Sequence, residues 1–315
     1  MNNNIFSLSI LIPTFNRPQK LDKLLHSIKL NNLDSLCRYE IRIYDNNSEK
    51  DYSRVISKYD HLNIIYKKHS KNIGSKKNFY RLQKDSEMDW FCIISDDDYI
   101  ENNHFIQLIK LVEKYPKSFF ACNNTKVLNG NKFNKSPSMK SNYWKNNSFH
   151  NPSTQIMWKM YLNHFVSTGC IFRKIILKDL FLDDDDRIFL TELASKYPFC
   201  TSKKATAILT IHPDTISGRG GPRVNYDFKG LLESLSRKIE NAHNIHKENK
   251  NKAVNLSFII FYEYMIDFSK LAIKENLKFE SPKFCFEKKF FIIKLVLAIY
   301  FIIRKLFKFY FIVKL

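Results

Sequence analysis

Short apolar runs alternate with amphipathic stretches through the first two thirds of the chain. Seven runs have the length and apolar character of buried strands: residues 7–12, 39–44, 62–66, 90–95, 118–122, 165–173 and 205–212. Apolar side chains at helical spacing predict helices over residues 17–30, 75–82, 103–115 and 186–197. Strands that alternate with helices form βαβ units, so the pattern predicts an α/β fold with a largely parallel sheet.

The pattern changes in two places outside these elements. The polar residues 123–151 predict loops over one face of the sheet. After the Gly-rich residues 218–222, residues 226–278 keep a helical period without further strands, and Pro282 separates them from an apolar, basic tail. The predicted parts are a domain over 1–220 with halves 1–122 and 123–220, a helical extension over 221–282 and a tail over 283–315.

The tail, residues 283–315, combines apolar and basic side chains. It contains eight Lys or Arg and one Glu, and Lys294 interrupts its apolar run 290–303, which is too short to span a bilayer. On a helical wheel most of the basic residues fall on one side and many apolar residues on the other. This pattern predicts a helix that lies on an anionic membrane surface. A C-terminal helix that packs on the core is the alternative.

Composition narrows the class of protein. The 315 residues are 44% hydrophobic, as in globular proteins, and carry a net charge of +20. The six cysteines include no Cys-x-x-Cys pair, which argues against a zinc finger or a disulfide framework and predicts a reducing, cytoplasmic environment. The first 220 residues contain no basic stripe interleaved with aromatics, so we expect no nucleic-acid partner. The apolar run 5–12 lacks the basic flank and cleavage site of a targeting segment.

Polar clusters follow three of the predicted strands. They are Pro13-Thr14-Phe15-Asn16-Arg17, Asp45-Asn46-Asn47-Ser48 and Ser95-Asp96-Asp97-Asp98. Each cluster alone has the composition of an ordinary turn. In an open parallel sheet, however, ligands bind at the carboxyl ends of the strands, where all three clusters are expected to meet. The sequence therefore predicts one polar, ligand-binding crevice.

The acidic triplet Asp96–Asp98 is the sharpest chemical signal in the chain. Three adjacent carboxylates repel one another and resist burial unless a cation neutralises them. Carboxylate oxygens suit Mg²⁺ or Mn²⁺, which proteins hold with one or two carboxylates together with substrate phosphates. If the chain is extended here, Asp96 and Asp98 point to one side and Asp97 to the other. A solvated acidic turn is the alternative.

Four segments, in this order, resemble one known family: SLSILIPTFNR (7–17), YEIRIYDNNS (39–48), KNIGSKKNF (71–79) and FCIISDDDYI (91–100). Together they resemble the nucleotide-sugar half of family 2 glycosyltransferases with the GT-A fold, a Rossmann-like, mostly parallel sheet flanked by helices. The Ser-Asp-Asp-Asp form departs from the commoner Asp-x-Asp-Asp and is similar to the abequosyltransferase-like branch. The resemblance covers about residues 6–217.

The resemblance implies a metal-dependent inverting glycosyltransferase of the hexosyl- or N-acetylhexosaminyltransferase class. It implies Mn²⁺ or Mg²⁺ as cofactor and a nucleotide-sugar donor, with UDP preferred by its frequency in the family. The residues implied to bind the nucleotide are Pro13, Thr14, Phe15, Arg17, Asp45, Asn72, Gly74, Lys77, Asp96 and Asp97. Asp96 is expected to face the ribose, and Asp98 and His212 are implied as metal ligands.

The second half is expected to supply the general base. The segment before Lys196-Tyr197-Pro198 aligns the family's Glu-Asp pair with Asp185 and Asp186. The resemblance implies that Asp186 takes the proton of the acceptor hydroxyl, with capping of the following helix as the alternative role. Arg219 lies in the Gly-rich segment, which is either a lid over the diphosphate or a flexible linker.

A membrane-held glycosyltransferase suggests a lipid-linked acceptor. We expect a polyprenyl-diphosphate-linked glycan in bacterial surface polysaccharide, lipopolysaccharide or glycoprotein assembly. The enzyme is then expected to be cytoplasmic and peripheral on the inner face of the cell membrane. Two other classes remain as alternatives. One is a sugar-nucleotide pyrophosphorylase, although residues 13–17 lack the glycines of its phosphate loop. The other is a non-catalytic basic protein that binds membranes or nucleic acid.

Overall fold

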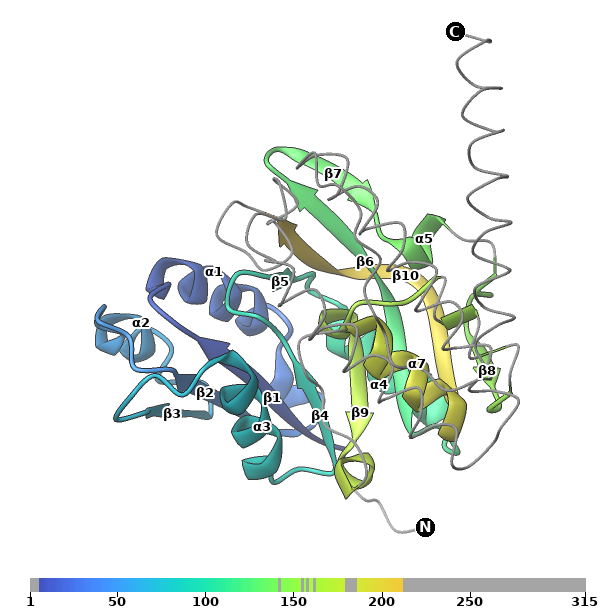
Figure 1. The fold of residues 1–315 in the computed structure, drawn as a ribbon, viewed down its shortest axis with the longest axis horizontal. Coiled ribbons are helices and arrows are strands. Elements are labelled where there is room, and N and C mark those ends of the chain that lie inside the picture. Colours follow the sequence, from blue (N-terminus) through green and yellow to red (C-terminus); the bar gives the residue numbers. More distant parts are fainter. Residues whose placement is uncertain are drawn as a thin grey trace, which may run out of the picture. The chain divides into compact units, whose positions relative to one another are not determined.

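Parallel strands and their crossover helices build the first half of the described chain. The computed structural model describes residues 6–140, 143–153, 156, 159–160, 163–178 and 186–211. In these residues ten strands form one sheet in the order β3-β2-β1-β4-β9-β6-β10-β5, with β7 beside β6 and β8 beside β10 (Figure 1). The strands are β1 (Ser7–Thr14), β2 (Arg38–Asp45), β3 (Ile64–Lys68), β4 (Trp90–Ile93), β5 (Tyr99–Ile100), β6 (Phe120–Asn129), β7 (Lys132–Lys135), β8 (Ser148–His150), β9 (Cys170–Arg173) and β10 (Phe199–Ile211).

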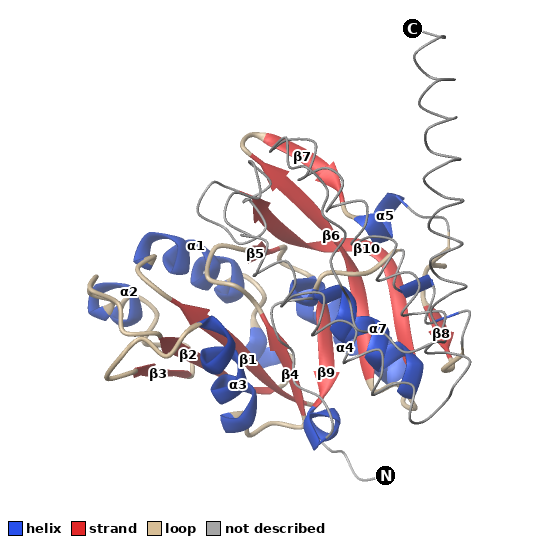
Figure 2. Ribbon diagram, viewed as in Figure 1, coloured by secondary structure: helices blue, strands red, loops and turns tan. Residues whose placement is uncertain are grey.

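Helices cover both faces of this sheet (Figure 2). The α-helices are α1 (Pro18–Lys29), α2 (Ser53–Ser57), α3 (Ser75–Asp85), α4 (His104–Lys114), α5 (Pro137–Lys140) and α7 (Asp186–Lys196). Short 3₁₀ turns are η1 (Leu33–Ser35), η2 (Ser167–Gly169) and η3 (Lys174–Lys178). Strand and helix alternate through the first half as predicted, and the prediction of an α/β fold is confirmed.

The two halves of the sheet differ in strand direction. β1 pairs in parallel with β2 and with β4, and β2 pairs in parallel with β3. In the second half β6 and β10 are parallel, but β9 runs antiparallel between β4 and β6. The short β5 and β8 are antiparallel to β10. β9 therefore joins a parallel first half to a mixed second half in one continuous sheet.

Alternate side chains of the central strands enter two separate apolar layers. On β1, Leu8, Ile10 and Ile12 contribute to a layer that also contains the buried side chains of α1 and α4. Leu11 contributes to the opposite layer, with Leu82 of α3 and buried side chains of α7. This arrangement follows from the two-residue period of a strand. Because both faces are covered, β1 and β4 are buried along their whole length.

The prediction of loops over residues 123–151 was wrong for much of this segment. β6 continues through Asn129, and β7, α5 and β8 follow. Polar side chains are accommodated inside the sheet because their amides find partners on β10: Asn123 Nδ2 donates to Thr206 Oγ1 at 2.9 Å, and Asn124 Nδ2 donates to the Lys203 carbonyl at 2.9 Å. Asparagine usually marks a turn, so these buried strand residues had the composition of a loop.

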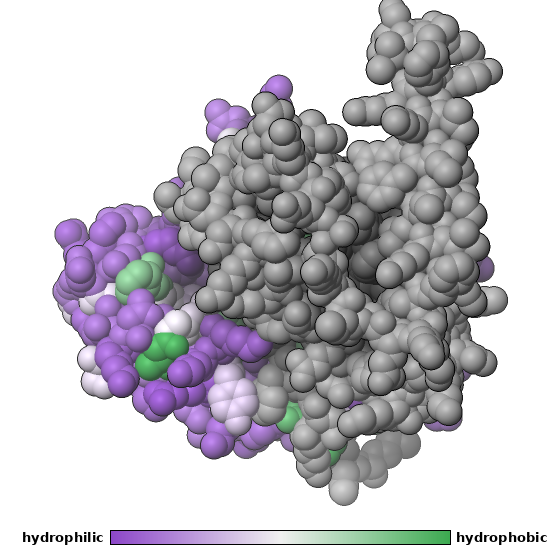
Figure 3. All heavy atoms as spheres, in the orientation of Figure 1, coloured by the Kyte–Doolittle hydropathy of each residue, from purple (hydrophilic) through white to green (hydrophobic). Residues whose placement is uncertain are grey.

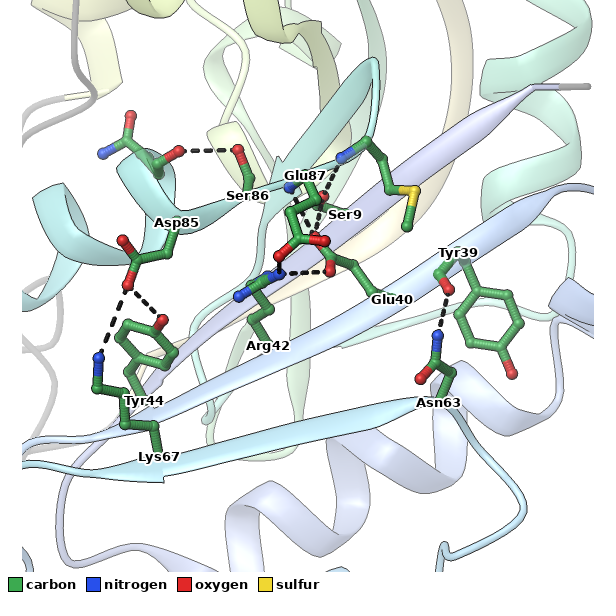
Figure 4. A network of polar contacts seen from close by, with 12 residues as sticks. Ser9, Tyr39, Glu40, Arg42, Tyr44, Asn63, Lys67, Asp85, Ser86 and Glu87 are labelled. Atoms are coloured by element: carbon green, nitrogen blue, oxygen red, sulfur yellow. Dashed lines mark hydrogen bonds and ion pairs between the residues drawn. The ribbon is translucent and has the colours of Figure 1, made fainter. Parts of the chain in front are cut away.

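A buried charged network ties β1, β2 and the loop before β4 (Figure 4). Arg42 Nη2 lies 2.8 Å from Glu40 Oε2 and also contacts Glu87, while Ser9 Oγ donates to Glu40 Oε1 at 2.6 Å. Burial opposes ionisation of Glu40, but the Arg42 guanidinium and the Ser9 hydroxyl outweigh it, so the pKa of this carboxyl lies below its usual value. The Ser9–Glu40 hydrogen bond joins β1 to β2, the strands that carry the first two polar clusters, and the Arg42–Glu87 ion pair joins β2 to the loop before β4.

Several predicted parts lie outside the described residues. The helical extension over 221–282 and the basic tail over 283–315 both do so. The predicted domain boundary at residue 220 also lies there. Within the residues that the structure does describe, no helix combines the length and the apolar character needed to cross a bilayer.

Candidate active site

The polar ends of three parallel strands meet at one edge of the sheet. β1 and β2 end together, with Thr14 beside Asp45. β4 lies on the other side of β1, and residues 95–98 follow it directly. Carboxyl ends of neighbouring parallel strands point the same way, so the structure brings together the three clusters that the sequence placed at strand ends.

Two asparagines allow sharp turns after β1 and β2. Asn16 (φ 56°) and Asn47 (φ 66°) lie in the left-handed region, which asparagine tolerates better than most side chains. The two turns also contact each other. The Asn16 N–H donates to Ser48 Oγ at 2.7 Å, and Asn16 Oδ1 accepts from the Glu49 N–H at 2.8 Å. These bonds hold the first two clusters as a unit.

Asp96 is fully buried where the first and third clusters meet. Thr14 Oγ1 donates to Asp96 Oδ2 at 2.6 Å, and Arg17 Nη2 lies 2.6 Å from Asp96 Oδ1 as an ion pair without hydrogen-bond alignment. Since the Thr14 proton points to Asp96, the Tyr52 hydroxyl donates to Thr14 at 2.8 Å and accepts from the Arg17 N–H at 2.8 Å. Tyr52 was not among the predicted site residues, because a lone tyrosine between polar residues carries no pattern.

Burial and charge act in opposite directions on Asp96. Burial raises the pKa of this carboxyl to about 6, against the opposing effects of the Arg17 guanidinium and the Thr14 hydroxyl. The carboxyl is therefore mostly ionised at neutral pH. Arg17 Nη1 also lies 2.7 Å from Asp97 Oδ2, so one guanidinium spans two adjacent carboxylates. The planar fork of arginine suits this geometry, whereas a lysine ammonium presents a single nitrogen.

The acidic triplet lies in a turn, which corrects the expectation of an extended chain. β4 ends at Ile93, and the Asp98 N–H donates to the Ser95 carbonyl at 3.0 Å. Asp96 and Asp98 are both buried, but they have different partners. This backbone bond closes the turn and overrides the alternation expected of a strand end, and aspartate is a common turn residue.

Asp98 is held by residues from the second half of the chain. Thr168 Oγ1 in η2 donates to Asp98 Oδ2 at 2.7 Å, and the Thr210 N–H in β10 donates to Asp98 Oδ1 at 2.9 Å. Both donors are neutral, in contrast to the arginine beside Asp96. Neither threonine was predicted from the sequence, since they lie 70 and 112 residues away from Asp98 along the chain.

Gly169 allows η2 to approach the sheet closely enough for its neighbour Thr168 to reach Asp98. A Cβ atom at this position would lie 2.6 Å from the Asn123 carbonyl oxygen and 2.7 Å from Thr125 Oγ1. Such distances are well inside van der Waals contact. The glycine is therefore required for the close packing of η2 on β6.

The remaining polar residues after β2 hold the loop that leads into α3. Asn46 Nδ2 donates to Asn72 Oδ1 at 2.9 Å, and the same Asn72 oxygen accepts from the Gly74 N–H at 2.9 Å. Gly74 has φ 82°, where L side chains are strained, and it precedes the first residue of α3. The structure thus brings Asn72 and Gly74 beside the second cluster, as expected.

Asp45 lies beneath this loop and faces the protein interior. Asp45 Oδ1 accepts from the Ser48 N–H at 2.9 Å, and Oδ2 accepts from the Tyr66 hydroxyl at 2.9 Å. Burial and the adjacent Asp45 both raise the pKa of Tyr66 above its usual value, so its hydroxyl remains a donor. A role for Asp45 in binding a base stays a prediction.

The other predicted residues divide between surface positions and the undescribed part of the chain. Pro13 is buried at the end of β1, whereas the Phe15 side chain is 40% exposed and Lys77 is exposed on α3. Asp186 is the first residue of α7, but the structure does not describe its side chain. Three further predicted residues lie outside the described part of the chain: Asp185, His212 and Arg219.

The donor chemistry of the acidic triplet fits a divalent cation. Its carboxylate oxygens are the ligands that Mg²⁺ and Mn²⁺ prefer, and an oxygen that accepts one hydrogen bond keeps a second lone pair. Among the described residues, no three or more His, Cys, Asp or Glu side chains form a metal cage. Mg²⁺ usually binds one or two carboxylates and the substrate phosphates rather than a cage, so the residues present suit that kind of site. Metal binding by Asp98 and His212 stays a prediction.

Comparison with known sequences assigns the family. The pattern of glycosyl transferase family 2 matches residues 9–181, and the chain belongs to this family. A relative from Mycoplasma pneumoniae, the uncharacterized glycosyltransferase MG060 homolog, is 29% identical over 112 residues. This match covers 34% of the present chain and 37% of the relative, so the chain spans little more than a third of that protein's length.

Comparison with solved structures confirms the GT-A fold. S. aureus TarS 1-349 in complex with UDP-GlcNAc is similar with a TM-score of 0.61 and 18% identity, over 76% of this chain and 67% of that one. TarS 1-349 in another crystal structure gives a TM-score of 0.55 and 14% identity, over 87% and 93% of the two chains. At these identities the likeness shows the fold alone. The abequosyltransferase-like branch stays a prediction.

Proposed function

We propose that this family 2 protein is an inverting glycosyltransferase that moves a sugar from a nucleotide diphosphate donor to a hydroxyl group of a glycan acceptor. One observation carries the proposal. Thr14, Arg17 and a fully buried Asp96 meet at the carboxyl ends of parallel strands, where α/β folds bind their ligands. An ordinary solvated turn has no reason to bury a carboxylate and an arginine fork together.

A UDP-sugar, carrying a hexosyl or N-acetylhexosaminyl group, is the donor we propose. The likeness to TarS, which was solved with UDP-GlcNAc, supports this choice. In the proposed complex Phe15 and Arg17 border the base, while Asp96 and Asp97 face the ribose. Arg17 keeps both carboxylates oriented through its two nitrogens. Lys77, exposed in the first turn of α3, contributes positive charge beside the nucleotide.

Mn²⁺ or Mg²⁺ is the cofactor we propose, with Asp98 and His212 as the protein ligands. When bound there, the cation would neutralise charge that develops on the diphosphate leaving group. The Thr168 hydroxyl and the Thr210 N–H hold the Asp98 carboxylate in one orientation. A carboxylate that binds a metal needs hydrogen bonds of this kind to keep a fixed geometry.

Asp186, with Asp185 beside it, is the general base in this proposal. Asp186 begins α7, and the partial positive charge of a helix N-terminus favours an ionised carboxylate there. The carboxylate would take the proton of the acceptor hydroxyl as its oxygen attacks the anomeric carbon and the nucleotide diphosphate leaves from the opposite side. A single displacement of this kind inverts the anomeric centre.

A polyprenyl-diphosphate-linked glycan of bacterial envelope assembly is the acceptor we propose. The basic, amphipathic pattern of residues 283–315 supports attachment to an anionic membrane surface. The enzyme would then work at the cytoplasmic face of the cell membrane, where such acceptors are accessible. A contact between Arg219 and the donor diphosphate is part of the same proposal.

Release of free nucleotide from a panel of sugar nucleotides tests the reaction class. We expect the purified full chain to release UDP from a UDP-sugar with Mn²⁺ or Mg²⁺, and to lose this activity with a chelator. Asp186→Asn should abolish transfer, while Asp51→Asn, the same change at an exposed loop position, should not. No nucleotide release from any donor, with or without divalent ions, would overturn the proposal. Condensation of a nucleoside triphosphate with a sugar phosphate would identify a pyrophosphorylase instead.

A further inference from the structure

A basic hollow of about 440 Å³ lies on the outer side of α3, away from the apolar core. Four of its six lining residues are cationic, one is acidic and one is aromatic: Lys67, Lys77, Tyr80, Arg81, Lys84 and Asp85. We call this the α3 groove. Figure 3 shows that the surface formed by the described residues on this side is predominantly hydrophilic.

The cations of α3 form a row along one helix face. Lys77, Arg81 and Lys84 follow one another at spacings of four and three residues, so they lie on the same side of the helix. Like charges at these spacings destabilise a helix. Within the described chain these three side chains form no ion pair, whereas exposed lysines elsewhere do, such as Lys58 with Asp22. The groove therefore presents three cations that have no ion-pair partner among the described residues.

Asp85, the acidic residue of the groove, already interacts with Tyr44 and Lys67. Asp85 Oδ2 accepts from the Tyr44 hydroxyl at 2.6 Å and lies 3.8 Å from Lys67 Nζ (Figure 4). Lys67 Nζ also lies 5.2 Å from the centre of the Tyr44 ring. Tyr44 and Asp85 thus fix Lys67 in the groove wall, and Asp85 compensates Lys67 rather than the row on α3.

The position and shape of the groove favour a linear anionic chain. Lys84 lies seven positions after Lys77 on the helix, so the row extends for about 10 Å. Its first cation lies in the turn that follows Gly74, and Asn72 links that glycine to Asn46 beside the proposed donor site. A bilayer surface is flat at this scale, whereas a chain can enter a hollow. The Tyr80 side chain, 44% exposed, offers a ring against which a sugar can pack.

We propose that the α3 groove binds a phosphate-bearing stretch of the acceptor glycan and holds it beside the donor site. This inference rests on the proposed glycosyl transfer, and it specifies an anionic acceptor. The cations neutralise phosphates spaced along the chain, and release of the chain's counterions adds to the affinity, which falls as salt rises.

Binding of inorganic polyphosphate to the full chain tests the groove, whichever glycan the enzyme uses as acceptor. The test variant is Arg81→Gln/Lys84→Gln, which spares Lys77 because of its place beside the nucleotide. The matched control is Lys110→Gln/Lys117→Gln, which removes two exposed cations at α4 and just after it. At low salt we expect the groove variant to bind labelled polyphosphate roughly tenfold more weakly than wild type, and the control to lose less than twofold.

Three comparisons make the result decisive. Equal loss in both variants, or no loss in the groove variant, would overturn the proposal, because affinity would then follow net charge alone. Two further outcomes would also overturn the proposal. If the groove variant loses binding only to phosphatidylglycerol vesicles, the groove binds a membrane surface. If it loses binding only to an oligothymidylate, the groove binds a nucleic acid. Nucleotide release from UDP-sugar without acceptor should be unchanged in the groove variant. If the wild type lacks that activity but the groove variant still loses polyphosphate binding, the proposed reaction fails while the anion site stands.

Discussion

Asp96 and Asp98 are two residues apart, yet they are held by different halves of the molecule. Asp96 is paired with Thr14, the last residue of β1, and with Arg17, which follows that strand, so both partners belong to the first half of the chain. Among the described residues, the donors to the Asp98 carboxylate are the Thr168 hydroxyl and the Thr210 N–H, which are neutral and belong to the second half. The first carboxylate is thus fixed by a local ion pair and the second by long-range hydrogen bonds.

This difference indicates how the site depends on the fold. The Asp96 environment requires the pairing of β1 with β4 and the segment after β2 that carries Tyr52, all within the first half of the chain. The Asp98 environment additionally requires η2 and β10 to pack on the parallel half, which happens through β9. We infer that damage to the second half should change the carboxylate at Asp98 first and leave the pair at Asp96 in place. Variants can separate the two environments.

Among variants that separate these two environments, Asp98→Asn should have the largest effect on transfer. The amide keeps an acceptor for the Thr210 N–H, and the Thr168 hydroxyl can rotate to accept from the new Nδ2, so the fold should lose under about 1 kcal/mol. The loss of the charge should lower the transfer rate about 1000-fold, if Asp98 holds the cation that stabilises the leaving group. Transfer kinetics and urea unfolding of the same preparation measure the two effects. Near-normal transfer would show that Asp98 only joins the two halves.

Gly169→Ala should have the largest effect on stability. The new Cβ would meet the Asn123 carbonyl and Thr125 Oγ1 at the 2.6 and 2.7 Å given above, so η2 must move away from β6. We expect a loss of about 3 kcal/mol in the free energy of unfolding, together with reduced transfer because Thr168 moves from Asp98.

Gly74→Ala is the matched control for this prediction. No atom lies within 4 Å of the position that its Cβ would take, and only the positive φ opposes the change. With φ 82° and ψ 154°, Gly74 lies in a region that is essentially restricted to glycine, so we expect a loss of about 2 kcal/mol in the free energy of unfolding. Equal losses in the two alanine variants, measured by urea unfolding, would mean that close packing of η2 is not what Gly169 provides.

Arg17→Lys should lower the activity less than Asp98→Asn does, and its effect should be confined to activity. One ammonium can contact Asp96 or Asp97 but cannot span both as the guanidinium does. We expect kcat/KM to fall roughly 30-fold, about 2 kcal/mol, mainly through KM for the donor. Arg42→Lys is the control, because Arg42 also lies between two carboxylates, Glu40 and Glu87, but inside the sheet. It should lower the free energy of unfolding and leave kcat/KM unchanged; the reverse pattern would contradict the assignment of Arg17.

The features that the sequence predicts well are those encoded locally. Strand ends and turn residues lie within a few positions of one another, so the local pattern alone places the clusters around Thr14, Asp45 and Asp96. It does not reveal the supports of Asp98, because threonine hydroxyls and backbone N–H groups leave no periodic signal and come from distant strands. The prediction of a loop at Asn123 was wrong because the local signal was misleading. Asparagine is typical of a turn, but here the side chain is hydrogen-bonded to Thr206 on the neighbouring strand, and the residue belongs to a strand.

Substitution of His104 should have the smallest effect of these predictions, and that effect reports on the packing of the second half. The side chain is fully buried at the start of α4, with Nδ1 2.9 Å from Thr206 Oγ1. Burial lowers the pKa of His104 to about 3. An unfolded histidine titrates near pH 6.5, so between these values the unfolded chain binds one proton more than the folded chain. Stability present above pH 6.5 is therefore lost as the pH falls, by about 1.4 kcal/mol per pH unit.

His104→Asn should remove this part of the pH dependence. We expect the free energy of unfolding of wild type to fall about 1 kcal/mol more than that of the variant between pH 6.5 and 5.5. His26→Gln, at an exposed position on α1, should keep the wild-type slope. Urea unfolding of all three proteins at each pH gives the comparison. Parallel curves for wild type and His104→Asn would mean that water reaches this ring in the folded state, and that β10 packs less tightly against α4 than the contact with Thr206 indicates.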